Sequence, residues 1–162
     1  IWRANRMAKH SRALLAAGDH EGSELAIREL LAATPWDHES GSILAALQVD
    51  SGEPSVALAT LDSIDAWSAS RGSWIARAQA LRATQREKDA VEVLEAAVAA
   101  LPDFLRAHFL LGELYASLGM SEESRASFRR LIDSPQDSPA AEAFKERAGG
   151  ALERGTDESP QG

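Results

Sequence analysis

Four histidines, His10, His20, His38 and His108, are the side chains best suited to bind a metal ion or to transfer protons. No two of them have a spacing that would place two metal ligands on one face of a helix. Residues 37–40 read Asp-His-Glu-Ser, but they lie at a predicted junction between helix pairs, where Ser and Asp are ordinary capping residues. We therefore predict solvent-exposed or inter-helix histidines rather than a catalytic or metal site.

Cysteine chemistry and phosphate-loop chemistry find no support in the sequence either. The chain has no cysteine, which excludes disulfides, thiolate catalysis and Cys-ligated zinc. Its glycines are mostly isolated loop residues, so none belongs to a glycine-rich phosphate loop. We predict a protein that is not an enzyme and that uses no cofactor and no metal.

The charge of the chain is divided unevenly between its start and the rest. Arg3, Arg6, Lys9 and Arg12 carry all the charge of the first twelve residues, whereas the remainder holds 13 basic and 25 acidic side chains. An acidic body argues against a general nucleic-acid-binding protein, because neutralising phosphates supplies most non-specific affinity for nucleic acids. The abundance of Ala, and of Arg over Lys, suggests a bacterial gene of high GC content.

The start of the chain also suggests contact with a membrane. Trp2 is followed by Arg3 and Arg6, a pattern typical of the interfacial end of a membrane anchor. The chain opens on Ile1 rather than Met, so we expect a fragment, preceded in the anchored case by an apolar segment of about twenty residues. That anchor would place the domain on the cytoplasmic side. The alternatives are the solvated first turn of a cytoplasmic protein, or a periplasmic location.

The elements that carry these residues are predicted to be paired helices. Apolar stripes of helical spacing alternate with loop residues Gly18, Gly52, Gln85 and Gly119, at intervals of 34, 33 and 34 residues. The predicted units are about 4–37, 38–70, 71–104 and 105–137, followed by a capping helix at about 138–152. Together they make one repeat domain over 1–153, and the polar residues 154–162 are expected to be disordered.

Small residues recur where the two helices of each unit must approach closely. They are Ser11, Ala45, Ala78 and Gly112 in the first helices and Ser23, Ala57, Ala90 and Ser124 in the second. Four residues after the second set come the large apolar Ile27, Leu61, Leu94 and Phe128. The third unit adds Trp74, Leu81 and Pro102, and the fourth adds Leu111 and Tyr115. Trp36 and Trp67, near the junctions of units, are expected to cover the seams between them or to lie exposed.

In this register the chain resembles the tetratricopeptide repeat family, whose pattern is W-x2-L-G-x2-Y, then A-x3-F, then P. The resemblance implies an all-α, right-handed superhelical solenoid of four helix hairpins plus a C-terminal capping helix. Three residues depart from the pattern: Gly41 and Gln48 in the second unit, and His108 in the fourth. We therefore expect the first helix of the second unit to be the least well packed, or to be shifted by one residue from this register.

The resemblance also predicts where a partner would bind. In similar proteins, the face of each first helix that is not used within the hairpin lines a concave groove, which holds a partner's extended peptide or helix. The residues predicted for this groove are Lys9, Arg12, Ile43, Val49, Ile75, Gln79, Arg82, Phe109, Leu110 and Glu113. Its apolar members, which solvent exposure alone would not favour, are expected to supply most of the affinity.

The function that follows is a non-catalytic scaffold that binds a protein or peptide partner in this groove. Two alternatives stay open. The chain could be the repeat segment of a larger enzyme, such as a transferase, or a membrane-anchored structural subunit of a bacterial complex.

Overall fold

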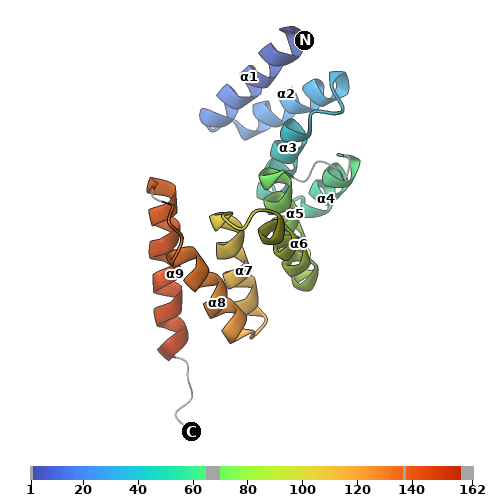
Figure 1. The fold of residues 1–162 in the computed structure, drawn as a ribbon. Coiled ribbons are helices and arrows are strands. Elements are labelled where there is room, and N and C mark those ends of the chain that lie inside the picture. Colours follow the sequence, from blue (N-terminus) through green and yellow to red (C-terminus); the bar gives the residue numbers. More distant parts are fainter. Residues whose placement is uncertain (1, 65–69, 137, 158–162) are drawn as a thin grey trace. The chain divides into compact units, whose positions relative to one another are not determined.

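Every element in the described part of the chain is an α-helix (Figure 1). The computed structural model describes residues 2–64, 70–136 and 138–157. Its helices are α1 (Trp2–Ala16), α2 (His20–Ala33), α3 (His38–Asp50), α4 (Pro54–Ser63), α5 (Arg71–Ala83), α6 (Glu87–Ala100), α7 (Leu105–Ser117), α8 (Ser121–Ile132) and α9 (Pro139–Asp157). The all-α prediction is therefore confirmed, and these helices follow the predicted order of paired elements and a final helix.

The helices fall into two compact units, each described by itself. Unit 1 is Ile1–Arg86 and holds α1 to α5, and unit 2 is Glu87–Gly162 and holds α6 to α9. The boundary lies in the loop of the third predicted repeat. Helix α9 ends at Asp157, beyond its predicted end near residue 152, so residues 154–157, which we expected to be disordered, are helical. Residues 158–162, the rest of that predicted tail, lie outside the described residues.

The four predicted loop positions share one backbone conformation. Gly18, Gly52, Gln85 and Gly119 have φ angles of 78°, 80°, 61° and 75°, in the left-handed region that favours glycine. After each of them, the next N–H donates to the carbonyl five residues earlier, from Asp19 to Leu14, Glu53 to Gln48, Arg86 to Leu81 and Met120 to Tyr115. This is a Schellman motif, which satisfies carbonyls at the helix end and turns the chain back.

The predicted positions of close approach are buried in both units. Where the second helix carries serine, its hydroxyl donates to the carbonyl of the small residue on the first helix. Ser23 Oγ lies 3.0 Å from the Ser11 carbonyl in unit 1, and Ser124 Oγ lies 2.8 Å from the Gly112 carbonyl in unit 2. The same bond thus recurs in two repeats, and it leaves neither buried hydroxyl unsatisfied. The large positions that follow, Ile27, Leu61, Leu94 and Phe128, are also buried.

Two glycines are required by packing rather than by backbone conformation. A Cβ on Gly112 would lie 2.5 Å from Cε1 of Phe128, which is closer than carbon atoms can approach. A Cβ on Gly41 would lie 2.4 Å from Cδ1 of Ile64. Ile64, at the end of α4, therefore fills the space that a bulky anchor residue on α3 would otherwise take.

The expectation that the first helix of the second unit is poorly packed is wrong. Helix α3 buries Ser40, Gly41, Ser42, Leu44, Ala45, Leu47 and Gln48. Gln48, the second departure from the repeat pattern, accepts a hydrogen bond of 2.8 Å from Thr60 Oγ1 on α4. A polar pair thus replaces the usual apolar contact, and both of the departures in this repeat are compensated from α4.

Apolar clusters join consecutive helix pairs within each unit. In unit 1, α3, α4 and α5 share a cluster of Ala45, Ala57, Leu61, Ile64, Ala76 and Ala80, and α2 meets α3 through Ile27, Leu44 and Leu47. In unit 2, α7, α8 and α9 share Leu105, Phe109, Phe128, Leu131, Ala141 and Ala148. Helix α3 thus packs against both α4 and α5 in unit 1, and α7 packs against both α8 and α9 in unit 2.

Gln85→Gly should raise the free energy of unfolding by about 0.5–1 kcal/mol, because glycine accepts a φ of 61° that strains a residue with a Cβ. Gly119→Ala is the matched control of opposite sign, since nothing lies within 4 Å of a Cβ at that position. Urea denaturation followed by circular dichroism measures both changes. A Gln85→Gly chain less stable than the native one would contradict the assignment of strain to Gln85.

Candidate functional site

The Asp-His-Glu-Ser sequence at residues 37–40 forms a helix cap. Asp37 precedes α3, and its carboxylate accepts the Ser40 N–H at 3.2 Å and the Ser40 hydroxyl at 2.8 Å. In unit 2, the buried imidazole of His108 has its Nε2 3.0 Å from the Pro102 carbonyl oxygen, a contact within the fold. Over the described residues, no three His, Asp or Glu side chains gather as a metal ion would need. These residues therefore cap and pack helices.

The first helices of unit 1 carry the exposed part of the predicted groove. Lys9 and Arg12 on α1 and Arg82 on α5 are exposed, and Gln79 is half-buried. Ile43 and Val49 on α3 are also half-buried, because each packs against a core cluster on one side. We call these six residues the unit 1 face. Four of the six are polar or charged, and the two aliphatic residues are both on α3.

An ion pair joins the first two of these helices. Arg12 Nη2 lies 2.9 Å from Glu39 Oε1, and both side chains are largely exposed. Helix α3 also packs directly against α5. Arg12 is therefore engaged with a neighbouring helix, and Glu39 places an acidic group beside it.

Two apolar residues of the predicted groove are buried instead of lining a surface. Ile75 and Phe109 are each only 4% exposed, and so is Ser42, which occupies the same register position one repeat before Ile75. Ser42 shows the reason, since it lies against Ser70 and Gly72, where the next first helix begins. In the second repeat this register position belongs to the contact between α3 and the start of α5. The apolar strip that we expected therefore does not exist as a free surface.

Helix α9 covers the corresponding face of α7 in unit 2. The Phe109 ring packs against Phe128 of α8 and Phe144 of α9, with centroids 5.8 and 5.7 Å apart. The Arg147 guanidinium lies 4.2 Å from the centroid of the Phe109 ring, and its Nη2 is 4.0 Å from Glu113 Oε1. Phe109 and Glu113 thus hold α9 in place, while Leu110 beside them stays half-buried.

Tyr115 has the ionisable group most strongly shifted by the fold. It is buried on α7, and its hydroxyl donates a 2.5 Å hydrogen bond to Glu95 Oε1 on α6. Burial, followed by this bond to an acidic group and the negative charge of Glu95 itself, raises the pKa of Tyr115 well above its ordinary value. The bond ties α6 to α7 and makes Tyr115 a poor proton donor near neutral pH.

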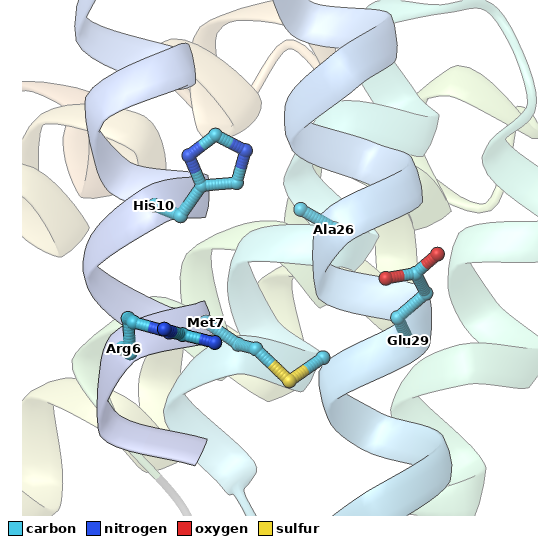
Figure 2. Close-up of a pocket in the computed structure, with 5 residues that line it drawn as sticks. All are labelled: Arg6, Met7, His10, Ala26 and Glu29. Atoms are coloured by element: carbon cyan, nitrogen blue, oxygen red, sulfur yellow. The ribbon is translucent and has the colours of Figure 1, made fainter. Parts of the chain in front are cut away.

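A hollow that the sequence did not reveal opens between α1 and α2 (Figure 2). Arg6, Met7 and His10 line it from α1, and Ala26 and Glu29 line it from α2. Met7 and His10 occupy register positions that in the second repeat are Gly41 and Leu44, both buried. In the first repeat the same positions form an open surface. The signal in the sequence was the polar His10 at a position where the second and fourth repeats have Leu44 and Leu111, although the third has Arg77.

The structure describes only some of the residues in the predicted membrane contact and only some of the tryptophans. The side chains of Trp2 and Arg3 lie outside those the structure describes, and so does Trp67. Trp36 is 71% exposed, so of the two alternatives it takes the exposed one and covers no seam between repeats. In the described part of the chain, no helix has the length and apolar character that crossing a bilayer requires.

Comparisons with known proteins define the class of this fold. Residues 75–142 match the family model of the tetratricopeptide repeat. A comparison with curated protein sequences finds no match. The resemblance to the tetratricopeptide repeat family, drawn above from the repeat register, is thus confirmed.

Solved structures agree with that class. A thermophilic tetratricopeptide repeat protein from Thermus thermophilus is 20% identical, with a TM-score of 0.76 over 93% of this chain and 84% of that one. A crystal structure of MamA is 19% identical, with a TM-score of 0.68 over 91% and 92%. MamA 41-end from Desulfovibrio magneticus RS-1 is also 19% identical, with a TM-score of 0.71 over 95% and 93%. At these identities the similarity establishes the fold alone.

Arg12 and Glu39 should show a coupling energy of about 0.2–1 kcal/mol in a double-mutant cycle, as is usual for exposed ion pairs. Arg12→Glu alone should destabilise the chain, and Arg12→Glu with Glu39→Arg should restore most of the loss. Denaturation at low and high salt measures the coupling, which salt should weaken. Additive effects at low salt would show that the pair does not link α1 to α3.

The single tyrosine makes its own titration visible. In the folded chain, the tyrosinate absorbance should appear well above pH 10, whereas in urea it should appear near pH ~10. Because the folded state holds the proton more tightly, the free energy of unfolding should fall as the pH rises past about 10. Tyr115→Phe should lack this component of the fall. Equal midpoints in the folded and unfolded chains would contradict the buried hydrogen bond to Glu95.

Proposed function

We propose that this protein is a non-catalytic scaffold that binds a segment of a partner protein on the unit 1 face. Tetratricopeptide repeat proteins are generally protein–protein interaction scaffolds. The observation that carries the proposal is the row of first helices in unit 1, where Lys9, Gln79 and Arg82 lie on surfaces that the hairpins do not use. A cytoplasmic location, with or without attachment to a membrane on that side, is part of the proposal and rests on the sequence.

The chemistry of the unit 1 face indicates the kind of segment that would fit. Lys9 and Arg82 supply cations, Gln79 supplies an amide, and the pair of Arg12 with Glu39 offers a donor beside an acceptor. Ile43 and Val49 offer part of their surface to an aliphatic side chain. The matching segment carries carboxylates at intervals and one or two aliphatic residues between them. Since Ile75 and Phe109 are buried, polar contacts set more of the specificity than the sequence suggested.

A charge reversal on this face tests the proposal. The Lys9→Glu, Arg82→Glu double variant should lose partners that the native chain recovers from cells of its source. For a partner recovered in this way, the Kd of the double variant should be about tenfold or more above that of the native chain. The increase should come mainly from slower association, which depends on salt.

The matched control is the Arg28→Glu, Lys88→Glu double variant. It makes the same change in net charge at exposed residues of the second helices α2 and α6. Circular dichroism should show both variants to be as helical as the native chain. Equal loss of binding in the two variants would mean that overall charge, rather than the unit 1 face, governs the interaction. Unchanged binding in both would reject this face as the binding surface.

A further inference from the structure

Helix α9 contacts unit 2 along a single stripe. Ala141 and Ala148 are buried, Phe144, Ala151 and Leu152 are half-buried against the same cluster, and the opposite side carries exposed residues such as Ala143 and Glu146. The surface that it covers is built by Leu105 and Phe109 of α7 and by Phe128 and Leu131 of α8. Figure 1 shows α9 alongside these two helices at the end of the described chain.

The contact of α9 with this surface relies on small or partly buried side chains. Its fully buried residues, Ala141 and Ala148, bury little area, and its one aromatic anchor, Phe144, is only half-buried. Gly149 and Gly150 lie inside the helix, where glycine is an unfavourable residue. Packing does not require them, because nothing lies within 4 Å of a Cβ at Gly149 and only the end of the flexible Arg154 side chain lies near one at Gly150. The glycines at Gly41 and Gly112, by contrast, are required by the close approach of a side chain.

The surface beneath α9 has recognition features of its own. The Phe109 ring accepts both an aromatic side chain on one side and a guanidinium at 4.2 Å, and Glu113 lies beside that cation. These features select a helix with a defined spacing. Relative to Ala141, the small, aromatic, cationic and small residues of α9 stand at i, i+3, i+6 and i+7.

We propose that the α7–α8 surface under α9 is an exchangeable helix-binding groove, which accepts an amphipathic partner helix of that spacing in place of α9. The partner helix carries a small residue, an aromatic residue, Arg or Lys and a second small residue at these positions, and it lacks the two glycines that weaken α9. This second binding surface is separate from the unit 1 face, and it stands if the proposal for that face fails. The apparent Kd of the partner is its intrinsic Kd divided by the fraction of molecules in which α9 has left the groove. The resident helix therefore weakens the apparent binding of the partner.

A synthetic peptide with the sequence of residues 138–157 and the changes Gly149→Ala and Gly150→Ala serves as the probe. It is labelled with fluorescein, and its binding to the full chain is followed by anisotropy. The Phe144→Ala chain, which loosens the resident helix and leaves the groove intact, should bind the peptide at least tenfold more tightly than the native chain. The chain with Gly149→Ala and Gly150→Ala should bind it several-fold more weakly. Glu146→Ala, on the exposed side of α9, is the matched control and should behave as the native chain.

The cation in the peptide provides a second readout. A peptide in which Arg147 is replaced by Glu should bind the Phe144→Ala chain at least threefold more weakly, and Glu113→Arg in that chain should recover the loss. Circular dichroism of each chain confirms that α1 to α8 remain folded. Equal peptide binding by the four chains, or no binding by the Phe144→Ala chain, would overturn the proposal. If the native chain forms dimers and the peptide dissociates them, the assignment to a separate partner would be overturned. In that case α9 of a second copy would fill the groove.

Discussion

The close approach of paired helices is the constraint on which the remaining structure depends. Gly112 faces the Phe128 ring, and Gly41 faces Ile64, with no space for a single added carbon atom. At the position of Gly112 the other repeats have Ser11, Ala45 and Ala78. On the second helices, the hydroxyls of Ser23 and Ser124 donate to the facing carbonyls of Ser11 and Gly112. Because the helices lie so close, large residues one turn further on fill the gap completely. The register of each repeat is therefore set by size, and the loops and outer faces follow from it.

Much of this arrangement could be predicted because it repeats along the sequence. The left-handed loop residues, the small positions and the large buried positions all recur at the repeat interval, and each is found where the register placed it. Gln85 was identified as a loop residue by its register alone, although its side chain gives no such signal. Local pattern was sufficient wherever the physical requirement was also local.

It was harder to predict which residues of each first helix are exposed, because adjacent residues on a helix face different directions. Neighbouring positions on a helix differ by about 100°, so Phe109 and Leu110 point to different surroundings. Phe109 lies under α9, whereas Leu110 is only half-buried. Ile64 fills the space beside Gly41, and Arg12 pairs with Glu39. In both cases the two residues belong to different parts of the helix array. No periodicity in the sequence encodes such pairings, which depend on the angle at which the helices cross.

The open surroundings of the Schellman loops have a consequence for engineering. At Gly18, Gly52 and Gly119, an added Cβ would meet no atom from another part of the chain within 4 Å, and the turns are closed by hydrogen bonds of the main chain. A peptide tag or a fluorophore-binding sequence inserted just after such a turn would meet no side chain of the core. Gly18 and Gly52 are one repeat apart along the chain and Gly119 follows two repeats later, so they offer points of attachment in different repeats. The chain can in this way carry added sequences while its helix pairs stay in register.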